Sequence, residues 1–274
     1  TAGFAPWFWR FFGGSSYVLH VQDLWPDSIT GSSLVKQGNV AIIIEKLLTP
    51  WLRSLYRKAS AIVSIAPTMA RSLVRRGSPA ERTHLVYNWA GTAADETTRN
   101  LSKGSRDNNL VRVLYAGNVG EMQDLETVVT AVHEAEDSGL FLTIVGDGVA
   151  LPRIKELVAS LGCSNVEFKK RVPSEHMAEL YASADYAIIP LRNLEVFEGT
   201  IPSKFQSALA HGLPVISTVP GDVRRLVEEW RIGFTARPEN VSDLEGALRR
   251  SAQLTLQERR ALGERALTAY LKHF

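Results

Sequence analysis

Residues 111–120 read VRVLYAGNVG, an apolar run from Val111 to Ala116 that is closed by two nearby glycines. A short run of β-branched and aromatic residues bounded by turn residues predicts a buried β-strand. Toward the C-terminus, similar apolar runs recur at 140–145, 165–168, 185–190, 213–217 and 233–235. Amphipathic stretches that predict helices lie between and after them, at 123–135, 150–161, 174–184, 203–211, 222–230 and from about residues 241 and 255. This alternation predicts βαβ units and a parallel sheet with helices on both faces.

Toward the N-terminus the same pattern is shorter. Strands are expected at 17–22, 61–65 and 83–87, and helices at 40–58 and 67–76, with Pro50 starting or kinking part of the first helix. The polar stretch 90–109 has no periodicity and is typical of a linker. The predicted fold is therefore α/β, with two Rossmann-like doubly wound parallel-sheet domains: a partial one over residues 1–105 and a complete one over residues 106–274.

The composition is that of a globular protein. The chain has 274 residues, of which 45% are hydrophobic and 22% charged, which excludes disordered and collagen-like proteins. The single cysteine, Cys163, excludes a disulfide scaffold and a cysteine-based zinc site. No apolar run approaches the roughly 18 residues that span a bilayer. The net charge of +2 is uneven: residues 1–105 hold 12 Lys/Arg against 6 Asp/Glu, and residues 106–274 hold 19 against 23. This asymmetry suggests different partners for the two halves.

The loops after the predicted strands are the places to look for chemistry, because ligands of doubly wound folds bind beyond the carboxyl ends of the strands. The loop Gly117-Asn118-Val119-Gly120 follows the first of them. Its glycines allow close backbone approach and the following helix N-terminus favours an anion, although a plain tight turn has the same residues. Lys169, Lys170 and Arg171 follow a later strand. They are either a solvated charge run or contacts to a base or phosphate.

The segment 198–204 is the most informative. It reads EGTIPSK and ends at a predicted helix start, where Thr200 and Ser203 are natural caps. Lys204 in the first turn opposes the usual dipole preference, which makes sense if a diphosphate binds there. A side chain that points outward to solvent is the alternative. No D-x-D triplet, H-E-x-x-H or G-x-S-x-G motif occurs, and the six histidines are scattered. No metal site is expected.

Several motifs together resemble the retaining glycosyltransferases of family 4, which have the GT-B architecture of two Rossmann-like domains. These motifs are DLWPDS at 23–28, AGNVG at 116–120, VGDG at 145–148, EGTIPSK at 198–204 and LAHGLPV at 209–215. The group most resembled is the bacterial enzymes of capsule, O-antigen and colanic-acid assembly, including N-acetylfucosamine transferases. The resemblance covers most of the chain, but its motifs do not specify a sugar.

The resemblance implies a nucleotide-sugar donor, with UDP as the expected nucleotide, a lipid-linked saccharide acceptor, and no cofactor or metal. It implies catalytic roles for Asp23, Glu198 and Lys204. The donor-binding residues implied are Gly117, Asn118, Gly120, Arg171, Val172, Gly199, Thr200, Ser203, Lys204 and Ser207. Backbone amides of the 117–120 loop and Lys204 would hold the diphosphate, and Arg171 and Val172 would lie near the base.

The chain departs from the family at some positions. Many relatives have a glutamate beside the donor ribose where this chain has Ser207, and a histidine before the motif aspartate where it has Gln22. Family members also have further N-terminal βα units and a longer C-terminus, so we expect an incomplete copy with little or no activity. Two alternatives to a transferase stay open: a nucleotide-sugar 2-epimerase of the same fold, and a degenerate nucleotide-binding module without catalysis.

Aromatic and basic residues alternate in the N-terminal half. Residues 5–12 read APWFWRFF, and the stretch 49–58 interleaves Trp51, Leu52, Leu55 and Tyr56 with Arg53, Arg57 and Lys58. This composition suits peripheral contact with an anionic membrane, and the expected location is cytoplasmic, on the inner face of the plasma membrane. Ordinary packing of a helix on a sheet is the alternative. The acidic second half and the lack of a recognised motif argue against nucleic acid as a partner.

Overall fold

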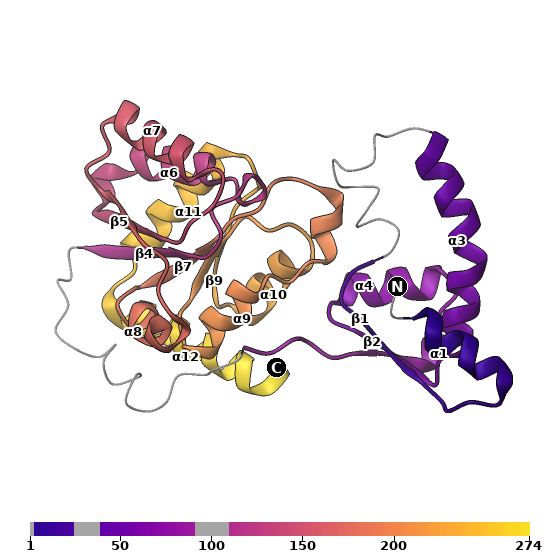
Figure 1. Ribbon diagram of the computed structural model, residues 1–274. Coiled ribbons are helices and arrows are strands. Elements are labelled where there is room, and N and C mark those ends of the chain that lie inside the picture. The colour runs from indigo at the N-terminus through magenta and orange to yellow at the C-terminus, as the bar shows by residue number, and fades with distance from the viewer. Residues whose placement is uncertain (1–2, 25–38, 91–109) are drawn as a thin grey trace. The chain divides into compact units, whose positions relative to one another are not determined.

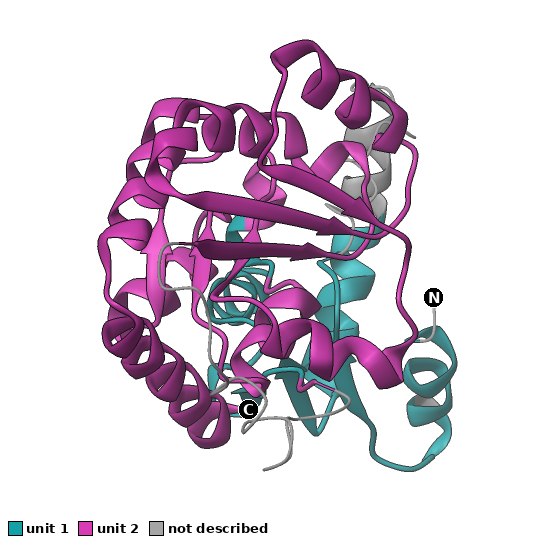
Figure 2. Ribbon diagram, turned by 90° about the vertical axis from the view of Figure 1, so that its left-hand side faces the viewer, with its two compact units in different colours: residues 1–88, 198–200 teal, residues 89–197, 201–274 magenta. Residues whose placement is uncertain are grey.

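The computed structural model describes residues 3–24, 39–90 and 110–274. The chain forms two compact units: unit 1 comprises residues 1–88 and 198–200, and unit 2 comprises residues 89–197 and 201–274 (Figure 2). The division falls between residues 88 and 89. The boundary expected at 105/106, most of the expected linker and residues 25–28 of the DLWPDS motif lie outside the described residues.

Unit 1 contains a three-stranded parallel sheet in the order β1-β2-β3. Its strands are β1 (Val18–Val21), β2 (Ala61–Ser64) and β3 (Thr83–Leu85), and its helices are α1 (Phe4–Trp9), α3 (Asn39–Lys58) and α4 (Pro67–Arg75), with short 3₁₀ segments η1 (Arg10–Phe12) and η2 (Ala80–Arg82) (Figure 1). The helix α3 runs through Pro50 without ending, so the expected start of a helix at this proline is wrong.

Helix α1 was not expected from the sequence as a helix. Its Trp7 packs against α3, where the indole Nε1 donates a hydrogen bond to Ser54 Oγ at 2.9 Å and the ring meets Trp51 edge-on. The interleaved apolar residues of α3 also point inward, because Leu52, Leu55 and Tyr56 are buried. For these three residues, the 49–58 stretch therefore packs inside its unit, as expected for a helix packed on a sheet.

Unit 2 is built on a six-stranded parallel sheet in the order β6-β5-β4-β7-β8-β9 (Figure 1). The strands are β4 (Val111–Ala116), β5 (Leu140–Val145), β6 (Val166–Lys169), β7 (Tyr186–Ile189), β8 (Val215–Ser217) and β9 (Gly233–Thr235). The helices are α6 (Leu125–Glu134), α7 (Leu151–Leu161), α8 (Met177–Ala182), α9 (Ser203–Ala210), α10 (Asp222–Trp230), α11 (Val241–Gln253) and α12 (Leu256–His273), and the 3₁₀ segments are η3 (Glu121–Gln123), η4 (Glu136–Ser138), η5 (Ser174–His176) and η6 (Glu195–Gly199), whose last two residues belong to unit 1.

Helices cover both faces of this sheet. Helices α6, α7 and α11 enclose a continuous buried cluster with the inward side chains of β4 and β5. Helix α12 packs on α9 and α10, which lie beside β7 and β8 (Figure 1). The predicted α/β fold with parallel sheets is confirmed. Strand order reverses between β4 and β7, and ligands of doubly wound sheets bind beyond the strand ends at such a point.

The C-terminal helix is tied to this sheet by a buried ion pair. Asp185, just before β7, lies 3.7 Å from the Arg259 guanidinium of α12, and both side chains are about 5% exposed. The same carboxylate accepts a hydrogen bond from the backbone N–H of Arg112 on β4. Among the described residues, no helix is long and apolar enough to cross a membrane.

Candidate functional site

Two glycine loops meet backbone to backbone at the carboxyl ends of β4 and β5. A Cβ atom placed on Gly146 would lie 1.9 Å from the carbonyl oxygen of Gly117, and one on Gly148 would lie 2.3 Å from that of Val119. Gly117 and Gly146 also have φ values of 141° and 148°, which side chains disfavour. Only glycine allows this approach, so the two loops form one rigid rim beyond the sheet.

Lys204 reaches this rim from the first turn of α9. A Cβ atom on Gly117 would lie 2.4 Å from Lys204 Cε, so the lysine side chain occupies the space that the glycine leaves open. The lysine ammonium donates a hydrogen bond to the Tyr115 hydroxyl at 2.5 Å. No ion pair of Lys204 occurs within the described ranges, and burial lowers its pKa to about 8. The site therefore holds a mostly buried cation that no carboxylate of the described residues neutralises.

Most backbone amides of the 117–120 loop already donate hydrogen bonds within the protein. The N–H of Gly117 donates to Val145 O and that of Val119 to Asp147 O, both at 2.9 Å, while the N–H of Gly120 donates to Gln123 Oε1 at 3.1 Å. The amide of Asn118 is the one left for a ligand within the described part of this loop. The N–H groups of Ser203 and Lys204 at the start of α9 add further donors, because a helix leaves such groups without internal partners. The N–H of Phe205 already donates to Pro202 O at 2.9 Å.

Beside Gly117 lies a pocket of about 370 Å³, within the range of small-ligand sites. We call it the edge pocket; it is lined by Ala116, Gly117, Asn118, Val145, Gly146, Asp147, Arg171, Val172, Ser174 and Met177. Arg171 and Val172 thus line the same pocket as Gly117 and Asn118, which is compatible with the expected place for a base. Their roles stay a prediction.

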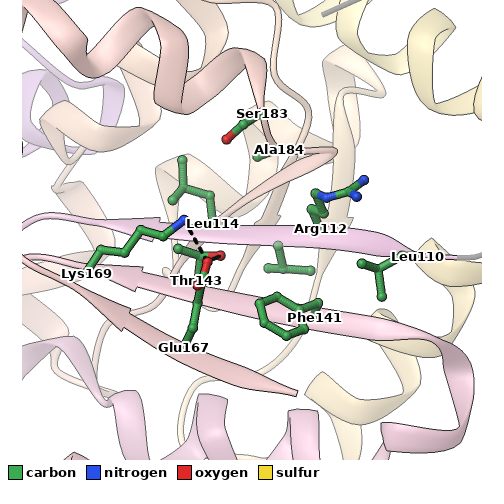
Figure 3. A pocket seen from close by; sticks show the side chains of 10 residues that line it. Leu110, Arg112, Leu114, Phe141, Thr143, Glu167, Lys169, Ser183 and Ala184 are labelled. Atoms are coloured by element: carbon green, nitrogen blue, oxygen red, sulfur yellow. Dashed lines mark hydrogen bonds and ion pairs between the residues drawn. The ribbon is translucent and has the colours of Figure 1, made fainter. Parts of the chain in front are cut away.

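A second pocket, of about 200 Å³, lies over the face of β4, β5 and β6 (Figure 3). We call it the face pocket; it is lined by Leu110, Arg112, Val113, Leu114, Phe141, Thr143, Glu167, Lys169, Ser183 and Ala184. Its central charges satisfy each other, because Lys169 Nζ and Thr143 Oγ1 both lie 2.8 Å from Glu167 Oε1. Burial alone would raise the pKa of Glu167, but these hydrogen bonds and the lysine charge outweigh it and lower the pKa.

Ser207 and Ser203, the other expected residues of α9, have different surroundings. Ser203 is exposed at the helix start. Ser207 faces α8: burial raises the pKa of Tyr181, and a hydrogen bond with Ser207 opposes that rise. The backbone oxygen of Ser207 lies 2.8 Å from Nδ1 of His211. Ser207 is therefore held in contacts between helices.

The remaining expected residues lie in unit 1. Asp23 is exposed in the bend after β1. Glu198, also exposed, and the less exposed Gly199 and Thr200 are grouped with unit 1 by their contacts. The structure thus brings together Gly117, Asn118 and Lys204, with Arg171 and Val172 along the shared pocket. Within the described ranges, no group of three or more His, Cys, Asp or Glu side chains could hold a metal ion.

Sequence reasoning missed two residues of this site. Tyr115 lies in an apolar strand and therefore resembled ordinary core, and only its position two residues before the glycine loop hinted at more. The sequence predicts that a helix starts at Gln123. Gln123 instead ends η3, before Asp124, whose φ of 46° delays α6 to Leu125, and its side chain closes the loop onto Gly120.

The chain is similar to known glycosyl transferases in sequence. A curated relative is a candidate colanic acid biosynthesis glycosyl transferase, WcaI, of Escherichia coli (strain K12), 26% identical over 88% of this chain and 61% of its own length. A GDP-mannose-dependent alpha-mannosyltransferase of Mycobacterium tuberculosis is 28% identical over 67% of this chain and 46% of its own length. The chain thus spans less than two thirds of these relatives.

The fold has counterparts among solved structures. Alr3699/HepE of Anabaena, crystallised in complex with UDP and glucose, matches all of this chain and 71% of its own, with a TM-score of 0.71 and 16% identity. A family model described as "Glycosyl transferase 4-like domain" matches residues 1–89, and one described as "Glycosyl transferases group 1" matches residues 97–268. The match over 97–268 covers more than half of the chain, which therefore belongs to the family of group 1 glycosyl transferases.

Proposed function

We propose that unit 2 binds the diphosphate of a nucleotide-sugar and that the protein transfers the sugar with retention of configuration and without a metal. The observation that carries this proposal is the mostly buried ammonium of Lys204 beside the rim of Gly117 and Gly146. A buried cation without a counter-ion is costly, and an anion that it meets in the working state would remove that cost. The Asn118 amide and the N-terminus of α9 supply further donors for the same anion.

The chemistry fits a nucleoside diphosphate leaving group. As the bond from the sugar to the diphosphate breaks, negative charge develops on the departing phosphate oxygen. A fixed ammonium and helix dipole stabilise that charge in the transition state without needing to reorganise. Arg171 and Val172 in the edge pocket would contact the base. Catalytic roles for Asp23 and Glu198, and donor contacts of Gly199, Thr200, Ser203 and Ser207, belong to the same proposal.

The relatives favour a role in bacterial surface polysaccharide synthesis. The name of WcaI refers to colanic acid biosynthesis, and HepE was crystallised with UDP and glucose. We therefore propose a UDP-sugar as the donor and a lipid-linked saccharide as the acceptor, with GDP-sugars as the next candidates because of the mycobacterial relative.

Isothermal titration calorimetry tests donor binding. UDP or GDP should bind the purified chain, and Lys204→Met, which keeps the length of the side chain without its charge, should weaken binding about 10- to 100-fold, the worth of a hydrogen bond to a charged group. Lys169→Met is the matched control, because Lys169 is already paired with Glu167. Failure of both nucleotides to bind, or equal affinities for the protein and Lys204→Met, would contradict the proposal.

A peripheral membrane contact through unit 1 is the second part of the proposal. Trp9 and Phe12, at the end of α1 and in η1, are 64% and 71% exposed on either side of Arg10. Exposed aromatic rings beside a cation suit the headgroup region of an anionic bilayer. Flotation with vesicles containing phosphatidylglycerol should retain the protein, and Trp9→Ser with Phe12→Ser should release it. Trp89→Ser is the control, because Trp89 lies in unit 2 and is similarly exposed at 66%. If the control variant lost vesicle binding as well as the Trp9→Ser, Phe12→Ser variant, the binding would be nonspecific adsorption.

A further inference from the structure

Tyr115 lies under the rim of the candidate site without lining the edge pocket. It is the second-last residue of β4, and its side chain is 0% exposed. The hydroxyl accepts a hydrogen bond from Lys204 Nζ and donates one to the backbone oxygen of Asn118. Burial raises the pKa of Tyr115, so the hydroxyl keeps its proton at neutral pH and can donate. One buried hydroxyl thus joins the cation of α9 to the loop after β4.

The ring and the loop leave the lysine little freedom. The Lys204 ammonium lies 4.0 Å from the centroid of the Tyr115 ring, in the arrangement of a cation–π contact. The Cε atom of Lys204 lies against Gly117, on the side where any other residue would have its Cβ atom. The ring in turn belongs to the main buried cluster with side chains of α6, α7 and α11. The buried core of unit 2 therefore fixes the Tyr115 ring, and the ring in turn fixes the position of the ammonium.

The geometry points to Tyr115 as a positioning residue whose hydroxyl bridges the ammonium of Lys204 and the Asn118 carbonyl, so that the cation and the loop amide face one diphosphate together. The inference rests on the proposed function and assigns a part of that site to a residue which does not touch the donor. An ammonium has three donors, and one is used on Tyr115, which leaves the others for phosphate oxygens.

Removing only the hydroxyl should separate the role of Tyr115 in positioning Lys204 from the role of its ring in the core. In Tyr115→Phe the ring still fills the core, but within the described residues Lys204 loses its hydrogen-bond acceptor and the Asn118 carbonyl loses its donor. The charged form of Lys204 is then less well stabilised, so its pKa should fall below that of the wild-type chain. In the wild-type chain the titratable side chain in contact with the ammonium is Tyr115, and no carboxylate of the described residues lies within ion-pair distance of it.

Tyr186→Phe is the matched control. Tyr186 lies on β7 of the same sheet, is also 0% exposed, and its hydroxyl donates to the backbone oxygen of Ser251 at 3.2 Å. Burial raises its pKa as well. Both substitutions delete one buried hydroxyl, so both should lower stability to a similar extent. The Tyr186 hydroxyl has no hydrogen bond to Lys204, so a purely structural effect would be the same in the two variants.

Calorimetry at pH 7 with UDP and with uridine, on the wild-type chain and on both variants, tests the inference. Tyr115→Phe should weaken UDP binding about tenfold and leave uridine binding unchanged, while Tyr186→Phe should leave both unchanged. An NMR titration of lysine ¹³Cε, assigned with Lys204→Met, should show a lower pKa of Lys204 in Tyr115→Phe. Wild-type affinity for UDP together with an unchanged Lys204 titration would overturn the role of Tyr115.

The two proposals fail in different ways. If neither UDP nor GDP binds the wild-type chain, the proposed function fails, and the Lys204 titration in the free protein still decides whether Tyr115 controls the ammonium. If UDP binds and depends on Lys204 but not on the Tyr115 hydroxyl, the proposed function stands and the positioning role is wrong.

Discussion

The edge pocket and the face pocket use the same three strands of unit 2, and each has a lysine beside it. In the face pocket Lys169 is exposed and paired with Glu167, which also accepts from Thr143 (Figure 3). Beside the edge pocket, at Gly117, Lys204 is mostly buried, donates to a neutral hydroxyl and has no ion pair among the described residues. A cation with its own carboxylate has little to offer a ligand, whereas a buried cation without one attracts an anion. Pairing therefore distinguishes the two pockets better than volume or composition.

The largest effect should come from breaking the rim of the edge pocket. Gly146→Ala places a methyl group 1.9 Å from Gly117 O at a φ of 148°, and the two loops must move apart. We expect a loss of about 2 kcal/mol or more in the free energy of unfolding and a loss of UDP affinity of about 100-fold. Chemical denaturation and calorimetry measure the two quantities.

Gly162→Ala is the control for this change. Gly162 follows α7 with a φ of 68°, and nothing lies within 4 Å of an added Cβ atom. Its substitution should cost only the backbone strain of about 1 kcal/mol and leave UDP affinity intact. Equal effects of the two substitutions on UDP affinity would mean that the close approach of the loops does not shape the site.

The charge of Lys204 predicts a pH dependence of the edge pocket. Burial lowers its pKa to about 8, so the ammonium is present below that value and is lost as the pH rises through it. UDP affinity should be nearly constant up to about pH 7, be about twofold weaker at pH 8, and then fall toward tenfold per pH unit. Lys204→Met should bind weakly with no such fall. A wild-type affinity that stays constant up to pH 9.5 would show that the ammonium does not hold the diphosphate.

The smallest effect is expected in the face pocket. Glu167→Gln removes the carboxylate partner of Lys169, but both side chains are more than a third exposed, so the change in unfolding free energy should be below about 1 kcal/mol. The lowered pKa of Glu167 means that the pair stabilises the fold above the unfolded-state pKa of about 4.3 and less as the pH falls through the folded-state value. UDP affinity should not change. Tighter UDP binding by this variant would show that the ion pair between Lys169 and Glu167 had kept the face pocket from binding the nucleotide.

Much of unit 2 was predictable because its local signals agree with its tertiary structure. The strand Val111–Ala116 and the helix Asp222–Trp230 have the expected bounds, since each is a clear periodic pattern between turn residues. Lys204 was predictable as a cation that opposes a helix dipole. Elsewhere the local signals did not predict the structure: the left-handed Asp124 precedes α6, which begins only at Leu125, and α1 forms despite its unfavourable aromatic run.

The partnership inside the site was not predictable. A tyrosine in an apolar strand looks like core until the fold places Lys204 of α9, distant in sequence, against its hydroxyl. Likewise, nothing local to Gly120 shows that its amide is already used by Gln123. Sequence patterns report which residue types occur at a site, but hydrogen-bond partners depend on contacts between distant segments.

The missing side chain of Gly117 has a practical consequence. The lysine passes through the space where a Cβ atom would stand, so a single methyl group at position 117 is a steric switch for the cation. Such a substitution removes no charge and no hydrogen-bonding group from the protein. If the proposed function holds, it would displace the cation from the donor site while the chain keeps its charge, and acceptor recognition could then be studied apart from donor binding.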